Sequence, residues 1–133
     1  MTLDEPLGLA TASGGYDVRH ILYRTPDEGL QLFGHVNENS VVQAMIGHWE
    51  DLIEAAEDAA GDAAARTPDP HGVLVFSCAG RVAPLGPHLT AEATAISNAI
   101  GATPMAGLFT YGEFARVTGS TGFHNATVVV LAL

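Results

Sequence analysis

The sequence predicts an α+β fold, a two-layer sandwich in which two helices cover one face of a mainly antiparallel sheet of about five strands. Three observations predict it. Two segments carry apolar side chains at helical spacing, several short segments are rich in β-branched and aromatic residues, and glycines and prolines separate them. The 133 residues fit one domain, and the elements follow the order ββαβαββ.

The N-terminal third predicts a loop followed by a hairpin. Residues 1–15 contain proline and several glycines and are expected to be a loop-like lead-in. Residues 17–24 and 30–36 are expected to be two strands, joined by the Pro-Asp-x-Gly turn at 25–29. This part of the chain therefore supplies the first two strands of the predicted sheet.

A long helix is expected from residue 40 to about residue 65. Ser40 and Gln43 have the spacing of a capping box, and apolar residues then recur on one face. Trp49 lies in that apolar stripe, so we expect it to pack against the sheet. Pro68 prevents the helix from continuing much further.

The second half predicts three strands and a shorter helix. Residues 73–79 are apolar on both faces, which is typical of a central strand covered on both sides. Residues 90–101 are expected to form a helix capped by Thr90, and residues 105–111 and 127–133 to form strands. Residues 119–125, rich in glycine and small polar side chains, are expected to connect the last two strands.

Charge and composition exclude several classes of protein. Fifteen acidic residues against five arginines give a formal charge of −10, which disfavours nucleic acid as a partner. No apolar run is long enough to span a membrane, and residues 1–8 have neither the basic nor the apolar region expected of a signal peptide. A single cysteine cannot form an internal disulfide, which fits a cytoplasmic location. No histidines or cysteines have the spacing of zinc ligands, so no metal site is expected. No nucleotide-binding glycine motif is present either, so no motif supports nucleotide binding.

Polar side chains gather where strands and helices end, and they are the candidate ligand-binding residues. An arginine grips a carboxylate through two parallel hydrogen bonds, so Arg81 is the expected anchor of an anionic ligand. Glu113 would then receive an ammonium group on the opposite side. The full candidate set is Cys78, Arg81, Glu92, Thr110, Tyr111, Glu113, His124 and Asn125.

Other interpretations of these residues stay open. Arg81 can instead pair with Glu92 or Glu113 in a buried structural network. Cys78 can be a small core residue, or the nucleophile of a small enzyme that takes His124 or His88 as its base. An enzyme that uses Arg81 with Glu113 as an acid–base site is a further alternative. No catalytic residue is assigned.

Four segments resemble the C-terminal half of the FIST family. They are SCAGR at 77–81, Glu92, PMAGLFTYGEF at 104–114 and GFHNATVVVLAL at 122–133. The resemblance extends from about residue 6 to residue 133, and it departs from the family at residues 37–39, where NEN replaces a glycine-containing turn. The family pattern matches Cys78, Arg81, Glu92, Thr110, Gly112, Glu113, Asn125 and Thr127.

The resemblance implies an intracellular sensory domain in signal transduction that binds an amino acid or a similar small carboxylate and needs no cofactor. Because some FIST proteins resemble haem-binding nitric-oxide sensors, a haem-based gas sensor with His124 as axial ligand is an alternative. Expected partners are the small ligand and an N-terminal FIST half or signalling protein, with a second copy as a further possibility. The sequence is then either an excised domain or a short family member. The order of elements also resembles the chorismate-mutase-like fold of the YjgF family, which by itself carries no function.

Overall fold

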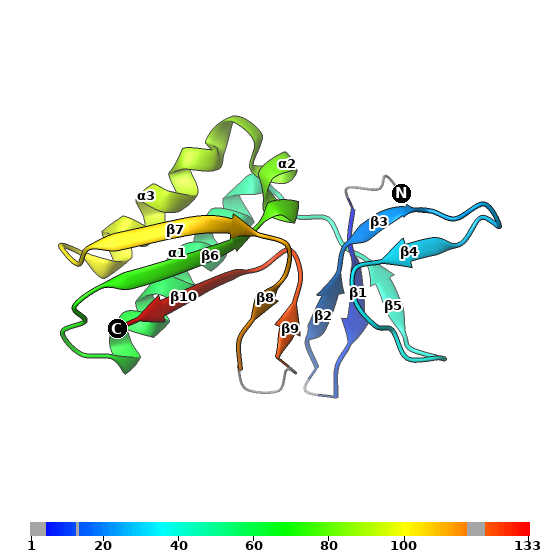
Figure 1. The fold of residues 1–133 in the computed structure, drawn as a ribbon, viewed down its shortest axis with the longest axis horizontal. Helices are drawn as coiled ribbons and strands as arrows, with labels where there is room; N and C mark the ends of the chain where they lie inside the picture. Colours follow the sequence, from blue (N-terminus) through cyan, green and yellow to red (C-terminus); the bar gives the residue numbers. More distant parts are fainter. Residues whose placement is uncertain (1–4, 13, 117–121) are drawn as a thin grey trace.

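The structure is a computed structural model that describes residues 5–12, 14–116 and 122–133 (Figure 1). An α/β group of elements lies beside a second group made only of strands (Figure 1). The helices are α1 (Trp49–Arg66), α2 (Val82–Leu85) and α3 (Leu89–Ile100), with single 3-10 turns at Ala79–Arg81 and Gly86–His88. The strands are β1 (Leu7–Ala10), β2 (Tyr16–Arg19), β3 (Ile21–Arg24), β4 (Leu30–Leu32), β5 (Val42–Ala44), β6 (Val73–Cys78), β7 (Met105–Thr110), β8 (Glu113–Phe114), β9 (Phe123–His124) and β10 (Val128–Ala132).

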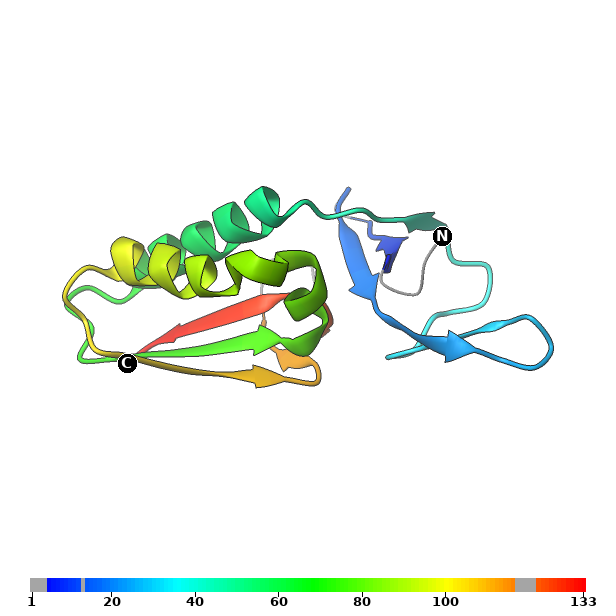
Figure 2. The same ribbon diagram turned by 90° about the horizontal axis from the view of Figure 1, so that it is seen from above.

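The sheet of the α/β group has the strand order β10-β6-β7, so the predicted central strand is confirmed. β6 runs antiparallel to β10 and parallel to β7. A parallel pair needs a crossover connection, and α3 provides it between β6 and β7. Figure 2 shows that α1 and α3 lie together on one face of this sheet, as the predicted fold class requires.

The core between these helices and the sheet is small. Ala56 and Ala60 of α1 are completely buried, and they meet Ile96 and Ile100 of α3 and the helix-facing valines of β6. Alanine side chains let α1 approach its neighbours closely, but they bury little apolar area. The helix is therefore held by a narrow contact.

Trp49 is not a core residue, and that prediction is wrong. Its side chain is 37% exposed and stacks on the ring of His88, with centroids 3.9 Å apart and an interplanar angle of 9°. Trp49 is the first residue of α1, so it lies at the end of the helix, beyond the core contact made by Ala56 and Ala60.

The helix also begins later than predicted. The hydroxyl of Ser40 donates to the carbonyl of Asn37 and caps no helix, and His48 is the actual N-cap. Residues 42–44 form β5, which pairs with β1. The β-branched Val41 and Val42 favour an extended backbone, and pairing with β1 outweighs the helical spacing of the apolar residues. The predicted end of the helix is confirmed, since α1 stops at Arg66.

The lead-in is not a loop throughout, because β1 is the central strand of the sheet β2-β1-β5. The first predicted strand divides at His20: β2 pairs with β1, whereas β3 pairs with β4. The turn at 25–29 is confirmed between β3 and β4. Its Thr25 hydroxyl donates to the carboxylate of Asp27, which lowers the pKa of Asp27.

The α+β class is confirmed, but a single sheet of about five strands is not. The described strands form four small sheets, and β6–β7 is a parallel pair within mainly antiparallel pairing. The sequence predicted a connection over residues 119–125. In the structure, β9 lies within that range and pairs antiparallel with β8, and residues 119–121 fall outside the described residues. Among the helices of the described residues, none combines the length and apolarity needed to cross a bilayer.

Candidate functional site

Arg81 and Glu92 form a buried ion pair at the end of β6. The 3-10 turn after β6 carries Arg81, whose side chain is only 3% exposed. Its Nε donates to Oε1 of Glu92 at 2.7 Å, and its Nη2 donates to the same oxygen. The other oxygen of Glu92, Oε2, accepts the hydroxyl of Ser77 at 2.8 Å. Glu92, in the first turn of α3, therefore points inward and pairs with Arg81, which is one of the alternatives that the sequence left open.

The guanidinium of Arg81 reaches two further elements. Its Nη2 donates to the carbonyl of Leu52 in α1 at 2.8 Å, and its Nη1 lies 3.5 Å from the carbonyl of Ala126, just before β10. The charge of Arg81 is balanced by Glu92, so an anionic ligand would have to compete with that carboxylate. This geometry matches the alternative in which the polar residues satisfy one another.

A second buried carboxylate lies in β8. Glu113 is 2% exposed, and it accepts the hydroxyl of Thr110 at 2.6 Å and that of Thr127 at 2.9 Å. Within the described part of the chain, no arginine or histidine forms an ion pair with it. Thr110, Glu113 and Thr127 thus come together, whereas Tyr111 is exposed.

The remaining candidates lie close in sequence but serve different contacts. The ring Nε2 of His124 lies 3.0 Å from the carbonyl of Ala115, to which it donates. Asn125 is fully buried, and its Nδ2 donates to the carbonyl of His124 at 2.9 Å. Its Oδ1 has no hydrogen-bond partner among the described residues. Cys78 is a buried free thiol.

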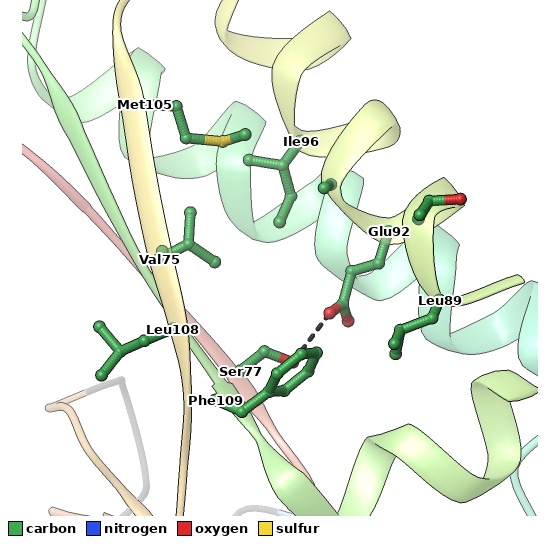
Figure 3. Close-up of a pocket in the computed structure, with 11 residues that line it drawn as sticks. Val75, Ser77, Leu89, Glu92, Ile96, Met105, Leu108 and Phe109 are labelled. Atoms are coloured by element: carbon green, nitrogen blue, oxygen red, sulfur yellow. Dashed lines mark hydrogen bonds between the residues drawn. The ribbon is translucent and has the colours of Figure 1, made fainter.

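A cavity of about 330 Å³ lies between α3 and β7 (Figure 3). Its lining is mostly apolar, with Val75, Ile96, Met105 and Phe109 around it. Gly107 brings no side chain into this space. The carboxylate of Glu92 and the hydroxyl of Ser77 form its polar end, joined by the hydrogen bond that Figure 3 draws as a dashed line.

Two further cavities of about 260 Å³ each lie beside the other charged residues. Arg81 borders one of them, together with His20 and Leu52. Glu113 borders the other, together with Thr110 and the apolar side chains of β6, β8 and β10. Arg81 and Glu113 therefore face different cavities, and this geometry does not favour a single small ligand that bridges both.

Two buried polar residues, Ser77 and Arg19, were not among the candidate residues chosen from the sequence. Ser77 holds Glu92, and alternation along β6 could have found it, because Val73, Val75 and Ser77 point to the same face. Arg19 is also buried, and its guanidinium donates to the carbonyls of His35 and Val18. No sequence pattern identified Arg19, since its burial depends on how the two groups of elements meet.

The family model of the FIST C domain matches residues 1–116, which is most of the chain. The chain belongs to the FIST C family. FIST C domains are sensory domains of signal transduction. The matched part of this FIST C domain contains the Arg81–Glu92 pair and Glu113, and it ends before β9 and β10.

Two relatives are similar over nearly the whole FIST C domain. They are the uncharacterized proteins MT0656 of Mycobacterium tuberculosis strain CDC 1551 / Oshkosh and Rv0628c of strain H37Rv. Each is 31% identical over 132 residues, which cover 96% of this chain and 33% of the relative. The chain thus spans about a third of the length of the curated relatives it matches. No solved structure matches it.

The donor set does not fit the haem alternative. His124 is not among the residues that line the cavities described above, and its Nε2 is hydrogen-bonded to a backbone carbonyl. Across residues 5–12, 14–116 and 122–133, no three side chains of histidine, cysteine, aspartate or glutamate gather as a metal-binding group.

Proposed function

We propose that this FIST C domain senses a small molecule that binds in the cavity between α3 and β7. A volume of about 330 Å³ lies within the range of small-molecule sites, and such sites are mostly apolar with a few placed polar groups. The observation that carries the proposal is the buried Glu92, which ends an otherwise apolar cavity and is held in place by Arg81 and Ser77.

The chemistry of Glu92 indicates the class of ligand. Its Oε2 accepts one hydrogen bond, from Ser77, and a carboxylate oxygen can accept a second. The ligand therefore presents a hydrogen-bond donor, such as an ammonium group, to Oε2 and an apolar body to Ile96, Met105 and Phe109. An apolar amino acid meets both requirements.

A titration series tests this ligand class. We would measure heat of binding and melting temperature with an apolar amino acid, with the amine that lacks its carboxylate, and with the acid that lacks its amino group. Specific binding stabilises the folded state by about 2.7 kcal/mol at a hundredfold excess over Kd. We expect the amino acid and the amine to bind and the acid to be inactive. Binding of the acid alone would contradict the proposal.

Two matched variants on α3 test the location. Ala93 is exposed and lines the cavity, so Ala93→Phe should obstruct the cavity and abolish binding without loss of folding. Asn98 is exposed on the same helix but does not line the cavity, so Asn98→Phe should bind normally. Equal effects of the two substitutions would place the ligand elsewhere.

The cavity beside Arg81 supports a second candidate, a small carboxylate held by that arginine. Nη1 of Arg81 has only the 3.5 Å contact to Ala126, so it is the nitrogen most available to a ligand. Arg81→Lys keeps the charge but removes the planar pair of donors, and it should abolish binding of the acid if this candidate holds. The same titration series thus separates the two sites.

A further inference from the structure

β7 is an unprotected edge of the α/β sheet. Among the described strands it pairs with β6 alone, which leaves its other side without a strand partner. Leu108 is 59% exposed, and Met105 and Phe109 are also exposed large apolar residues. Edge strands of monomers are usually protected by charges, prolines or bulges, and residues 105–110 contain no charged residue or proline. This edge has the features of a pairing surface.

The segment that contains α3 and β7 also presents no exposed formal charge. Between residues 82 and 112 the only formally charged side chain is Glu92, which is buried and paired with Arg81. By contrast, α1 carries most of the acidic surface of the helical layer, with Glu50, Asp51, Glu54, Glu57, Asp58 and Asp62 against the single Arg66. Two copies of a chain of charge −10 can approach along α3 and β7 without bringing these carboxylates together.

The exposed area of the molecule is large for its mass. The chain exposes 8206 Å², whereas a compact monomer of 13.8 kDa exposes about 6,600 Å². The excess of roughly 1,600 Å² is comparable to one partner's share of a permanent interface. The extended arrangement of the two groups of elements contributes to it, and the uncovered β7 edge adds apolar area (Figure 1).

We propose that a second copy of this chain docks on the surface formed by α3 and β7. The two β7 strands pair antiparallel across a twofold axis, which joins two three-stranded sheets into one of six strands. Because the axis is perpendicular to the sheet, both α3 helices lie on the same face and next to each other. The acidic α1 helices stay at the outside.

Sedimentation of the purified chain over a range of concentrations tests this arrangement. We expect twice the mass of the chain for the wild type. Leu108→Glu places two like charges near the axis, where their juxtaposition costs several kcal/mol, and should raise the dimer dissociation constant by at least about a hundredfold. Circular dichroism checks that the variant is folded.

Leu131→Glu is the matched control. Leu131 is also an exposed leucine, but it lies in β10 at the opposite edge of the same sheet, so this variant should remain a dimer.

If Leu108→Glu fails to fold, amide hydrogen exchange of the wild type decides: β7 amides should be protected at high concentration and exchange faster on dilution. A monomeric wild type, or a dimer broken by Leu131→Glu alone, overturns the proposal. A monomer that binds the remaining two thirds of a mycobacterial relative overturns it too, because that segment is then the occupant.

Discussion

Arg81 and Glu92 form a buried ion pair, and neighbouring residues hold both side chains in place. A buried pair of this kind adds little net stability, but removing one partner leaves an uncompensated charge in the interior. The pairing of Glu92 with Arg81 was an alternative that the sequence left open, because Glu92 has the spacing to share a face of α3 with Ile96 and Ile100. The position of Leu52 beside Arg81 could not be predicted, because it depends on how α1 packs on the rest of the fold.

The first prediction concerns this pair. Glu92→Ala should lower the free energy of unfolding by about 3–5 kcal/mol, because Arg81 stays buried without its counter-charge. Urea denaturation measures the change. The double variant Arg81→Met with Glu92→Leu should recover much of the loss, since it removes both charges. A loss below about 1 kcal/mol in the single variant would show that water already reaches the pair.

The second prediction concerns Trp49, which packs on His88 at the end of α1. A buried tryptophan replaced by alanine costs about 3–5 kcal/mol, whereas an aromatic stack contributes about 0.5–1.5 kcal/mol beyond its area. Trp49→Ala should therefore cost roughly 1–2 kcal/mol in thermal or urea unfolding. His88→Ala should cost a similar amount, and the two effects should not add. A loss of about 4 kcal/mol would instead indicate that Trp49 is a core residue.

The third prediction concerns Cys78. Its thiol is buried at the end of β6, and a reagent reaches it only when the structure opens. Alkylation by a small reagent should be at least about tenfold slower in the native protein than in urea. Rapid native modification would revive the alternative in which Cys78 is a nucleophile.

At the scale of elements, α1 shows that strand pairing can override a helical spacing of apolar residues. The apolar stripe and Pro68 were enough to predict the body and the end of the helix. The start was missed because residues 42–44 pair with β1, and β1 itself was hidden in a glycine-rich segment that predicts a loop. β6 was predictable as a central strand because its apolar run is continuous, although the helices cover only one of its faces (Figure 2).

The fourth prediction tests the start of α1. If Ser40 capped a helix, Ser40→Ala would cost about 1 kcal/mol, but as an exposed residue before β5 it should cost less than about 0.5 kcal/mol. His48 is the actual N-cap and makes no side-chain cap bond, so His48→Ser should raise stability by about 0.5–1 kcal/mol. Thermal unfolding of both variants checks the assignment.

At the scale of the whole molecule, several short sheets replace the single sheet that was predicted. The sequence shows where strands form, but their partners are set by contacts between distant segments, such as β1 with β5 and β6 with β10. The ion pair of Arg81 with Glu92 was among the alternatives open from the sequence. The sequence did not predict that Arg81 and Glu113 border different cavities, because that depends on how distant segments pack together.

The fifth prediction follows from the charge of the molecule. A formal charge of −10 repels itself in the folded state, and the acidic side chains of α1 repeat at i,i+4 spacing. Raising sodium chloride from low to moderate ionic strength should therefore raise the melting temperature by about 2–5 °C. Sucrose at equal osmolality serves as the control for effects of excluded solutes. An unchanged melting temperature in salt would mean that repulsion among the carboxylates contributes little to the stability of the folded state.

The guanidinium of Arg81 holds Glu92 on α3 and the Leu52 carbonyl on α1 at the same time. In the proposed function, a ligand that hydrogen-bonds to Glu92 would act on the carboxylate that pairs with Arg81, and Arg81 in turn holds α1. Thermodynamic linkage would then be reciprocal: a protein that binds α1 would change the affinity of the cavity for the proposed ligand by the same factor. If the proposed ligand binds, Arg81 is the side chain that connects its cavity to α1, and a change at one end could reach the other without a moving hinge.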